Sequence, residues 1–187
     1  MKRLFLAFDL SEDVRRSLAG ALFWMAGFAG RVKVVPPENY HVTLKFLGPT
    51  PEQRLASIRD ALEQEACFMA PCELGLAGWG VFPEKGTAKV FWVGVEPAEA
   101  LRPVFERCES ILEKQGFARE MRGFQSHVTV AREGSSPVPA DFLERWRSLR
   151  PVQGPVTFRA DKVALYESRT NAAGPVYTPV ALIGLGM

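Results

Sequence analysis

Two short stretches of this sequence carry the residues best suited to chemistry. The chain of 187 residues contains two histidines, and each opens a similar phrase: His41-Val42-Thr43-Leu44 and His127-Val128-Thr129-Val130. β-Branched and apolar residues alternate in both phrases, which is typical of a β-strand. Side chains two apart on a strand share a face, so each phrase is expected to present an imidazole beside a hydroxyl.

Two imidazoles in one site suit general acid–base catalysis because an unperturbed histidine titrates near neutral pH. One neutral ring takes a proton from an attacking water, and the other, protonated, gives a proton to a leaving oxygen. The hydroxyls of Thr43 and Thr129 can donate hydrogen bonds to an oxyanion. Two hydroxyls match the two non-bridging oxygens of a phosphodiester. Near-symmetry leaves open which histidine is the acid and which is the base.

The elements that position these phrases follow the same order twice. A strand, a helix, a histidine strand, a helix and a strand are predicted, and the series repeats, closing with two strands around a turn at 171–175. The histidines lie 127 − 41 = 86 residues apart, and the same shift carries Phe5 of the first strand onto Phe91. We interpret this as an internal duplication. The chain is therefore predicted to be one domain, 1–187, in two lobes of about 1–87 and 88–187, with both histidine strands facing a shared cleft.

Composition narrows the class of protein. Hydrophobic residues make up 47% and charged residues 24% of the chain, which is ordinary for a globular protein. A net charge of +2 is too small to indicate a nucleic-acid coat protein, although it permits a local basic cleft. Three cysteines without zinc-type spacing favour free thiols in a reducing compartment and give no support to a His/Cys metal site.

No stretch reaches the length of a membrane span or a signal peptide, so a cytoplasmic location is expected. We also expect no metal, no cofactor, no membrane association and no obligate protein partner, and a monomer.

The two phrases, extended to residues 41–48 (HVTLKFLG) and 124–132 (FQSHVTVAR), resemble the two signature motifs of the two-histidine (2H) phosphoesterases. More narrowly, they resemble those of the bacterial and archaeal RNA 2',3'-cyclic phosphodiesterases, once called 2'-5' RNA ligases. The resemblance covers essentially the whole chain, including residues 3–7 and 80–83. It implies a bilobal α+β fold with a pseudo-twofold axis, two antiparallel sheets lining a metal-free central cleft, and helices outside.

The resemblance also implies a reaction. The family hydrolyses ribose 2',3'-cyclic phosphates at RNA ends or in nucleotides to 2'-phosphomonoesters. In its usual account the first histidine protonates the departing 3'-oxygen and the second activates water, which makes His41 the acid and His127 the base. One departure stands out, because Ser126 occupies a position where the family commonly has proline. A proline would fix the start of the strand, so we expect Ser126 to leave His127 slightly freer.

Three further residues are candidates for substrate contact. Lys45 shares the face of His41 and Thr43 by strict alternation and could meet the substrate's charge, or it could be a solvated lysine at a strand end. Arg132 matches the family's arginine, which indicates phosphate or RNA contact. Strict alternation, however, puts Arg132 on the face opposite His127 unless the strand twists or ends. Phe124 could stack on a base or pack at the rim.

Two other functions fit the same residues. The first is 2'-5' RNA ligation, in which a ribose hydroxyl takes the place of water. The second is a non-catalytic module that binds a nucleotide or RNA end, although binding alone does not need two titratable groups.

Overall fold

The computed structural model describes residues 1–171 and 174–186, and the predicted turn at 171–175 therefore includes two residues, 172 and 173, outside the described part. Antiparallel strands form a single, strongly curled sheet. In the described residues the strands are β1 (Lys2–Asp9), β2 (Val32–Val34), β3 (His41–Thr50), β4 (Cys72–Phe82), β5 (Val90–Glu96), β6 (His127–Glu133), β7 (Thr157–Ala160), β8 (Lys162–Asn171) and β9 (Gly174–Gly184). Their order is β7-β4-β5-β6-β3-β1-β8-β9, and β2 pairs with β6.

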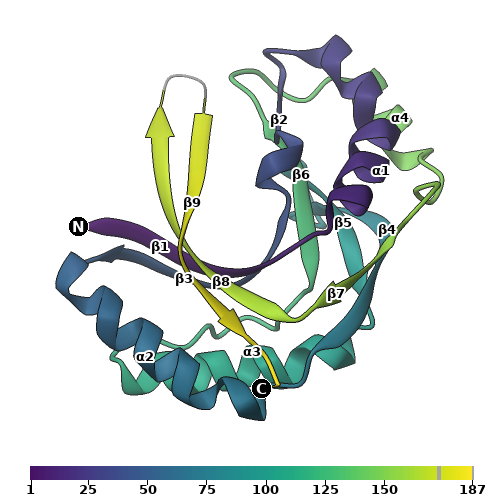
Figure 1. The fold of residues 1–187 in the computed structure, drawn as a ribbon. Helices are drawn as coiled ribbons and strands as arrows, with labels where there is room; N and C mark the ends of the chain where they lie inside the picture. The colour runs from purple at the N-terminus through teal and green to yellow at the C-terminus, as the bar shows by residue number, and fades with distance from the viewer. Residues whose placement is uncertain (172–173, 187) are drawn as a thin grey trace.

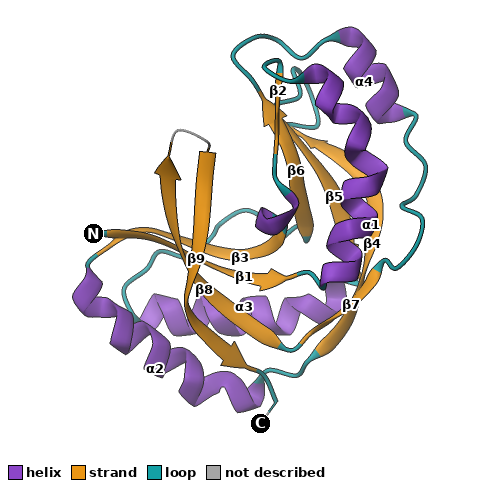
Figure 2. Ribbon diagram, turned by 45° about the horizontal axis from the view of Figure 1, so that its top comes forward, coloured by secondary structure: helices purple, strands orange, loops and turns teal. Residues whose placement is uncertain are grey.

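Helices cover one face of this sheet. They are α1 (Glu12–Leu22), α2 (Leu55–Glu65), α3 (Ala98–Lys114) and α4 (Ala140–Arg147), with short 3₁₀ segments η1 (Phe23–Phe28), η2 (Pro37–Asn39), η3 (Glu52–Arg54) and η4 (Ala66–Phe68). In both views α1 and α4 lie beside β4, β5 and β6, whereas α2 and α3 lie beneath β1, β3 and β8 (Figures 1 and 2). The α+β class and the outer position of the helices are confirmed.

The core lies between these helices and the convex face of the sheet. Buried side chains at alternating positions, such as Leu4 and Leu6 of β1 and Val42 and Val128 of the histidine strands, point into it. His41, Thr43, His127 and Thr129 are only partly buried and point to the other, concave face. Burying one face of each strand therefore fixes which side the polar residues take.

The sheet has two halves, and each half takes strands from both of the predicted lobes. β4 pairs with β5, and β8 pairs with β1, so the last strand of each sequence repeat joins the sheet of the other. The lobes therefore do not coincide with residues 1–87 and 88–187. The expected two sheets are also joined into one, at a single pair, Val42 and Val128, between β3 and β6.

A β-bulge interrupts each histidine strand at the equivalent residue. Along β1, Ala7 pairs with Thr43 but Leu6 pairs with Lys45, so Leu44 is the extra residue. The register shift of β5 against β6 leaves Val130 extra in the same way. An extra residue reverses the alternation of side chains beyond it. Simple alternation therefore fails after the threonine in both copies.

The first and fifth strands correspond at a different spacing from the histidine strands. Thr43 pairs with Ala7 and Thr129 pairs with Trp92, so the offset is 92 − 7 = 85 rather than 86. The alignment of Phe5 with Phe91 was therefore wrong by one residue. The two rings confirm this, because Phe5 contacts His41 whereas Phe91 packs among helix residues such as Phe142.

Candidate active site

The pair Val42–Val128 brings the two histidine phrases together. In antiparallel strands a step forward on one strand matches a step back on the other, so this register sets His41 across from Thr129 and Thr43 across from His127. All four side chains point to the concave face. The two histidine strands therefore lie side by side at the middle of the sheet, as the duplicated phrases predicted.

Both imidazoles are anchored through the same nitrogen. Nδ1 of His41 lies 2.7 Å from the carbonyl oxygen of Asn39, and Nδ1 of His127 lies 2.8 Å from that of Gln125. A carbonyl can only accept, so in each ring Nδ1 carries the proton and Nε2 remains the reactive nitrogen. These carbonyls were missed from sequence, although both belong to the residue two positions before the histidine.

Aromatic rings flank each imidazole. The ring of Phe5 lies 4.9 Å from that of His41, and Tyr177 contacts His41 edge-on at 5.3 Å. His127 has Phe82 edge-on at 5.1 Å and Trp92 at 5.8 Å. We call the rings beside each histidine its aromatic wall. Each wall restricts the orientation of its imidazole and reduces the contact of that imidazole with water.

Burial is the main cause that lowers the pKa of His41 below its ordinary value. The Asn39 carbonyl and the nearby Asp9 carboxylate act in the opposite direction and raise this pKa, whereas the positive charges of His127 and Arg132 lower it further. His41 is thus influenced both by the opposite histidine and by an anion of its own lobe.

Burial also lowers the pKa of His127, and the Arg132 guanidinium lowers it further, against the Gln125 carbonyl. The residue across from His127 on the neighbouring strand is Gly94, whereas the residue across from His41 is Asp9. The two imidazoles therefore differ electrostatically although their backbones are equivalent.

Asp9 lies beside this candidate site, and sequence reasoning missed it. It ends β1 directly opposite His41, and both its carboxylate oxygens accept from the hydroxyl of Tyr166, at 2.7 and 2.8 Å. Arg15 donates to the same carboxylate at 3.1 Å. The sequence shows an acid at the end of the first strand, but it does not show that this acid pairs with the histidine of strand β3.

Arg132 lies on the histidine face. The extra residue Val130 reverses the alternation, so Ala131 is buried and the side chain of Arg132 emerges beside His127 and Thr129. Its effect on the pKa of both histidines places its charge near both rings. The bulge resolves the conflict between strict alternation and the family arginine.

The equivalent bulge overturns the expectation for Lys45. Leu44 is the extra residue, so Lys45 turns into the core, where its side chain is 4% exposed. Its Nζ donates to both carboxylate oxygens of Glu109 in α3, at 2.7 and 2.8 Å, and to the carbonyl of Ala118 at 2.7 Å. Lys45 is a buried structural cation and does not face the site of the histidines.

Phe124 also lies apart from the histidines. Its ring stacks on Phe105 of α3, with ring centroids 4.4 Å apart and planes at 19°. Helix α3 covers the convex side of the sheet, so Phe124 packs at the rim as in the second of its two interpretations.

Ser126 holds the start of β6 through two hydrogen bonds to one residue. Its buried hydroxyl donates to the carbonyl of Val95 at 2.6 Å, and the N–H of Val95 donates to the carbonyl of Ser126 at 3.1 Å. The expected loosening of His127 is therefore offset, because the hydroxyl ties the strand where a proline would have stiffened it.

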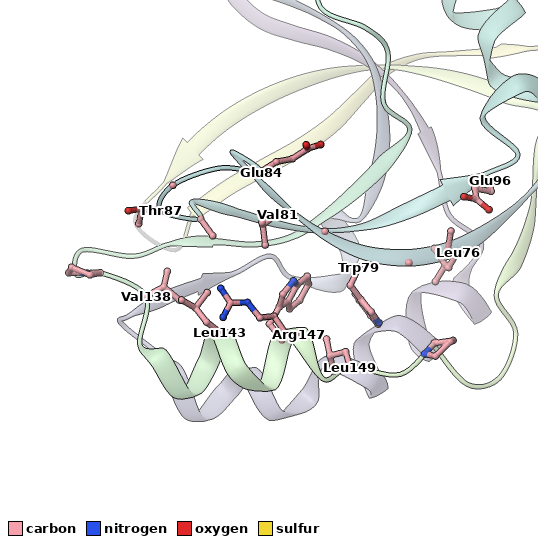
Figure 3. A pocket seen from close by; sticks show the side chains of 18 residues that line it. Leu76, Trp79, Val81, Glu84, Thr87, Glu96, Val138, Leu143, Arg147 and Leu149 are labelled. Carbon is pink, nitrogen blue, oxygen red and sulfur yellow. The ribbon is translucent and has the colours of Figure 1, made fainter.

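A cavity of about 980 Å³ lies elsewhere, between β4 and α4 (Figure 3). Trp79, Val81, Leu143 and Arg147 are among its lining residues, and neither histidine lines it. Within the described residues, no group of three or more His, Cys, Asp and Glu side chains is arranged to hold a metal ion. No helix in this part of the chain is long and apolar enough to cross a membrane.

The fold and the paired His-x-Thr strands define a class of protein, the two-histidine phosphoesterases. The sequence pattern of the 2'-5' RNA ligase superfamily matches residues 26–172. A protein of Archaeoglobus fulgidus named RNA 2',3'-cyclic phosphodiesterase is 36% identical over 147 residues, which cover 78% of this chain and 81% of the relative. One of the same name from Methanothermobacter thermautotrophicus is 32% identical over 183 residues, covering 98% of each chain.

Solved structures agree with the sequence comparisons. The crystal structure of TT0787 of Thermus thermophilus superposes with a TM-score of 0.82 at 31% identity and 98% coverage of each chain. The fold is also that of E. coli LigT complexed with 3'-AMP, with a TM-score of 0.77 at 23% identity, covering 100% of this chain and 99% of LigT. The chain belongs to the 2'-5' RNA ligase superfamily of two-histidine phosphoesterases.

Proposed function

We propose that this protein hydrolyses 2',3'-cyclic phosphates of RNA ends or nucleosides to 2'-phosphomonoesters, by two-histidine acid–base catalysis without a metal ion. The observation that carries the proposal is the matched anchoring of the two imidazoles, each with Nδ1 on a backbone carbonyl and each beside a threonine across one sheet. The names of the relatives and the 3'-AMP complex of LigT support this substrate class.

The reaction needs one proton taken and one given. Neutral His127 accepts a proton at Nε2 from water, whose oxygen forms a bond to phosphorus. The bond between phosphorus and the 3'-oxygen breaks, and protonated His41 gives its Nε2 proton to that oxygen. The products are a 2'-phosphomonoester and a free 3'-hydroxyl, and each histidine typically contributes about 10²–10⁴-fold to the rate.

Asp9 supports this assignment of roles. An acid must hold its proton before reaction, and the Asp9 carboxylate favours the protonated form of His41 because it raises the pKa of that ring. His127 has Gly94 in the equivalent position and so lacks this support. The near-symmetric site is thereby biased toward His41 as acid and His127 as base.

Thr43, Thr129 and Arg132 are assigned to the phosphate. Negative charge grows on the non-bridging oxygens in the transition state, and hydroxyl and guanidinium donors fixed around them stabilise it. Arg132 supplies the positive charge that a metal ion supplies in other phosphodiesterases. A 2'-5' ligase would use the same groups, with a ribose hydroxyl in place of water.

The direct test is turnover of adenosine 2',3'-cyclic phosphate with EDTA present, with the product isomer identified by chromatography. We expect adenosine 2'-phosphate from the native protein and a rate lower by about 10²–10⁴-fold in each of His41→Gln and His127→Gln. Circular dichroism melts check that both variants fold. Full activity in either variant, or activity lost to EDTA, would overturn the proposal, and a 2'-5' junction formed with added 5'-hydroxyl RNA would favour the ligase.

A further inference from the structure

A large apolar side chain lies open on the concave face, in the same strand as His41. Phe46 of β3 is 67% exposed, although the strand around it is mostly buried. The bulge at Leu44 turns it to this face, in the same way that the bulge at Val130 turns Arg132. The two residues are equivalent in the duplication, since 46 + 86 = 132. One lobe therefore presents a ring where the other presents a cation.

Phe46 continues the aromatic wall of His41. The ring of Phe5 lies 6.0 Å from that of Phe46 and 4.9 Å from that of His41, and Tyr177 meets both Phe5 and His41 edge-on. Phe5 itself is 2% exposed, so it supports the wall from below. Phe46 is the member whose ring remains open.

The chemistry of the substrate decides which lobe holds the nucleoside. This step rests on the proposed function, in which His41 protonates the departing 3'-oxygen. That oxygen belongs to the ribose, so the ribose must lie on the His41 side while water lies on the His127 side. The nucleobase is attached to the same ribose and is carried toward the wall that ends at Phe46. Aromatic side chains bind any base by stacking, because every base has a π-face.

We infer that the exposed ring of Phe46 is the platform on which the nucleobase of the cyclic phosphate stacks. The His127 lobe has rings too, but Phe82 and Trp92 lie against each other at 5.1 Å and both are partly buried. A base placed there would put the ribose beside the proposed general base.

Kinetics with two substrates test the inference. Phe46→Ala should lower kcat/KM for adenosine 2',3'-cyclic phosphate on the order of tenfold, mostly through KM. It should leave unchanged the hydrolysis of methyl riboside 2',3'-cyclic phosphate, which has no base. Phe46→Trp should keep native values, whereas Phe46→Leu, apolar but without a π-face, should resemble the alanine variant. Phe23→Ala, which removes an 81% exposed ring in η1, is the matched control.

An unchanged kcat/KM in Phe46→Ala, or an equal loss on both substrates, would overturn the inference while leaving the hydrolase intact. Should the native protein turn over no cyclic phosphate, the proposed function fails. Ligand binding measured by calorimetry then tests whether a nucleobase stacks on Phe46. Weaker binding of 3'-AMP by Phe46→Ala, with equal binding of inorganic phosphate, would then support stacking on Phe46. Equal binding of 3'-AMP would reject it.

Discussion

The backbone carbonyl of Asn39 accepts a hydrogen bond from Nδ1 of His41 at 2.7 Å, while the side-chain amide of Asn39 donates to the carbonyl of Pro175 at 2.8 Å. Asn39 is therefore a link between the proposed acid and strand β9. Tyr177, two residues after Pro175, contacts the same imidazole. The orientation of His41 thus depends on a strand from the far end of the chain.

Replacing Asn39 by alanine should remove this link and leave the carbonyl that holds His41. We expect a loss of about 1 kcal/mol in the free energy of unfolding, because one partly buried hydrogen bond is gone. A fall in kcat of about tenfold should accompany it as the ring becomes less well positioned. Urea denaturation and steady-state kinetics measure the two effects.

Gln125→Ala is the matched control, because Gln125 holds the other histidine through its backbone alone and its side chain is exposed. Its effect on kcat should be smaller than that of Asn39→Ala. Equal effects of the two variants would show that the amide of Asn39 has no special part in positioning His41.

The pH profile of kcat/KM should lie on the acidic side of that of two unperturbed histidines, since burial lowers the pKa of both rings. Activity rises with pH as His127 loses its proton and falls as His41 loses its own. Asp9→Asn removes a charge that raises the pKa of His41, so the falling limb should move to lower pH. Initial rates across the pH range measure both limbs.

Tyr166→Phe serves as the comparison for that variant, because it removes the hydroxyl that contacts Asp9 but leaves the carboxylate. Its falling limb should stay closer to that of the native protein. A shift of the rising limb alone in Asp9→Asn would reverse the roles assigned to the two histidines.

Lys45→Met should destabilise the fold without weakening substrate binding. It leaves the carboxylate of Glu109, whose side chain is 2% exposed, without its cation, and such a loss costs about 3–5 kcal/mol. Urea denaturation should show this cost, and KM of the folded fraction should be native. The double variant Lys45→Met/Glu109→Met should recover most of the stability. A raised KM with little loss of stability would instead indicate that Lys45 contacts the substrate.

Local pattern was sufficient to predict the two histidine strands and the face that histidine and threonine share in each of them. Alternation places His41 with Thr43 because burial of Val42 against the helices requires it. The duplication indicated that the second copy would meet the first. The α+β class and the outer helices followed from the order of the elements and from the family resemblance.

What sequence could not predict depends on pairing between distant strands. The bulges at Leu44 and Val130 arise from the register of β1 and β5, and they decide the opposite orientations of Lys45 and Arg132. The exchange of β4 and β8 between lobes and the approach of Asp9 to His41 have the same origin. To predict any of these features one must know which residue of another strand lies alongside. The alternation of residues along a single strand does not give that information.

The single residue pair Val42–Val128 relates the two repeats as a twofold axis relates the two chains of a symmetric dimer. At this pair the strands of the two repeats meet edge to edge. Each repeat contributes one histidine and one threonine, as each of two identical half-length chains would. A symmetric dimer of such chains would already hold a complete set of acid, base and hydroxyls. Within one chain the two copies can carry different residues, and position 46 holds a phenyl ring where the equivalent position 132 holds a guanidinium.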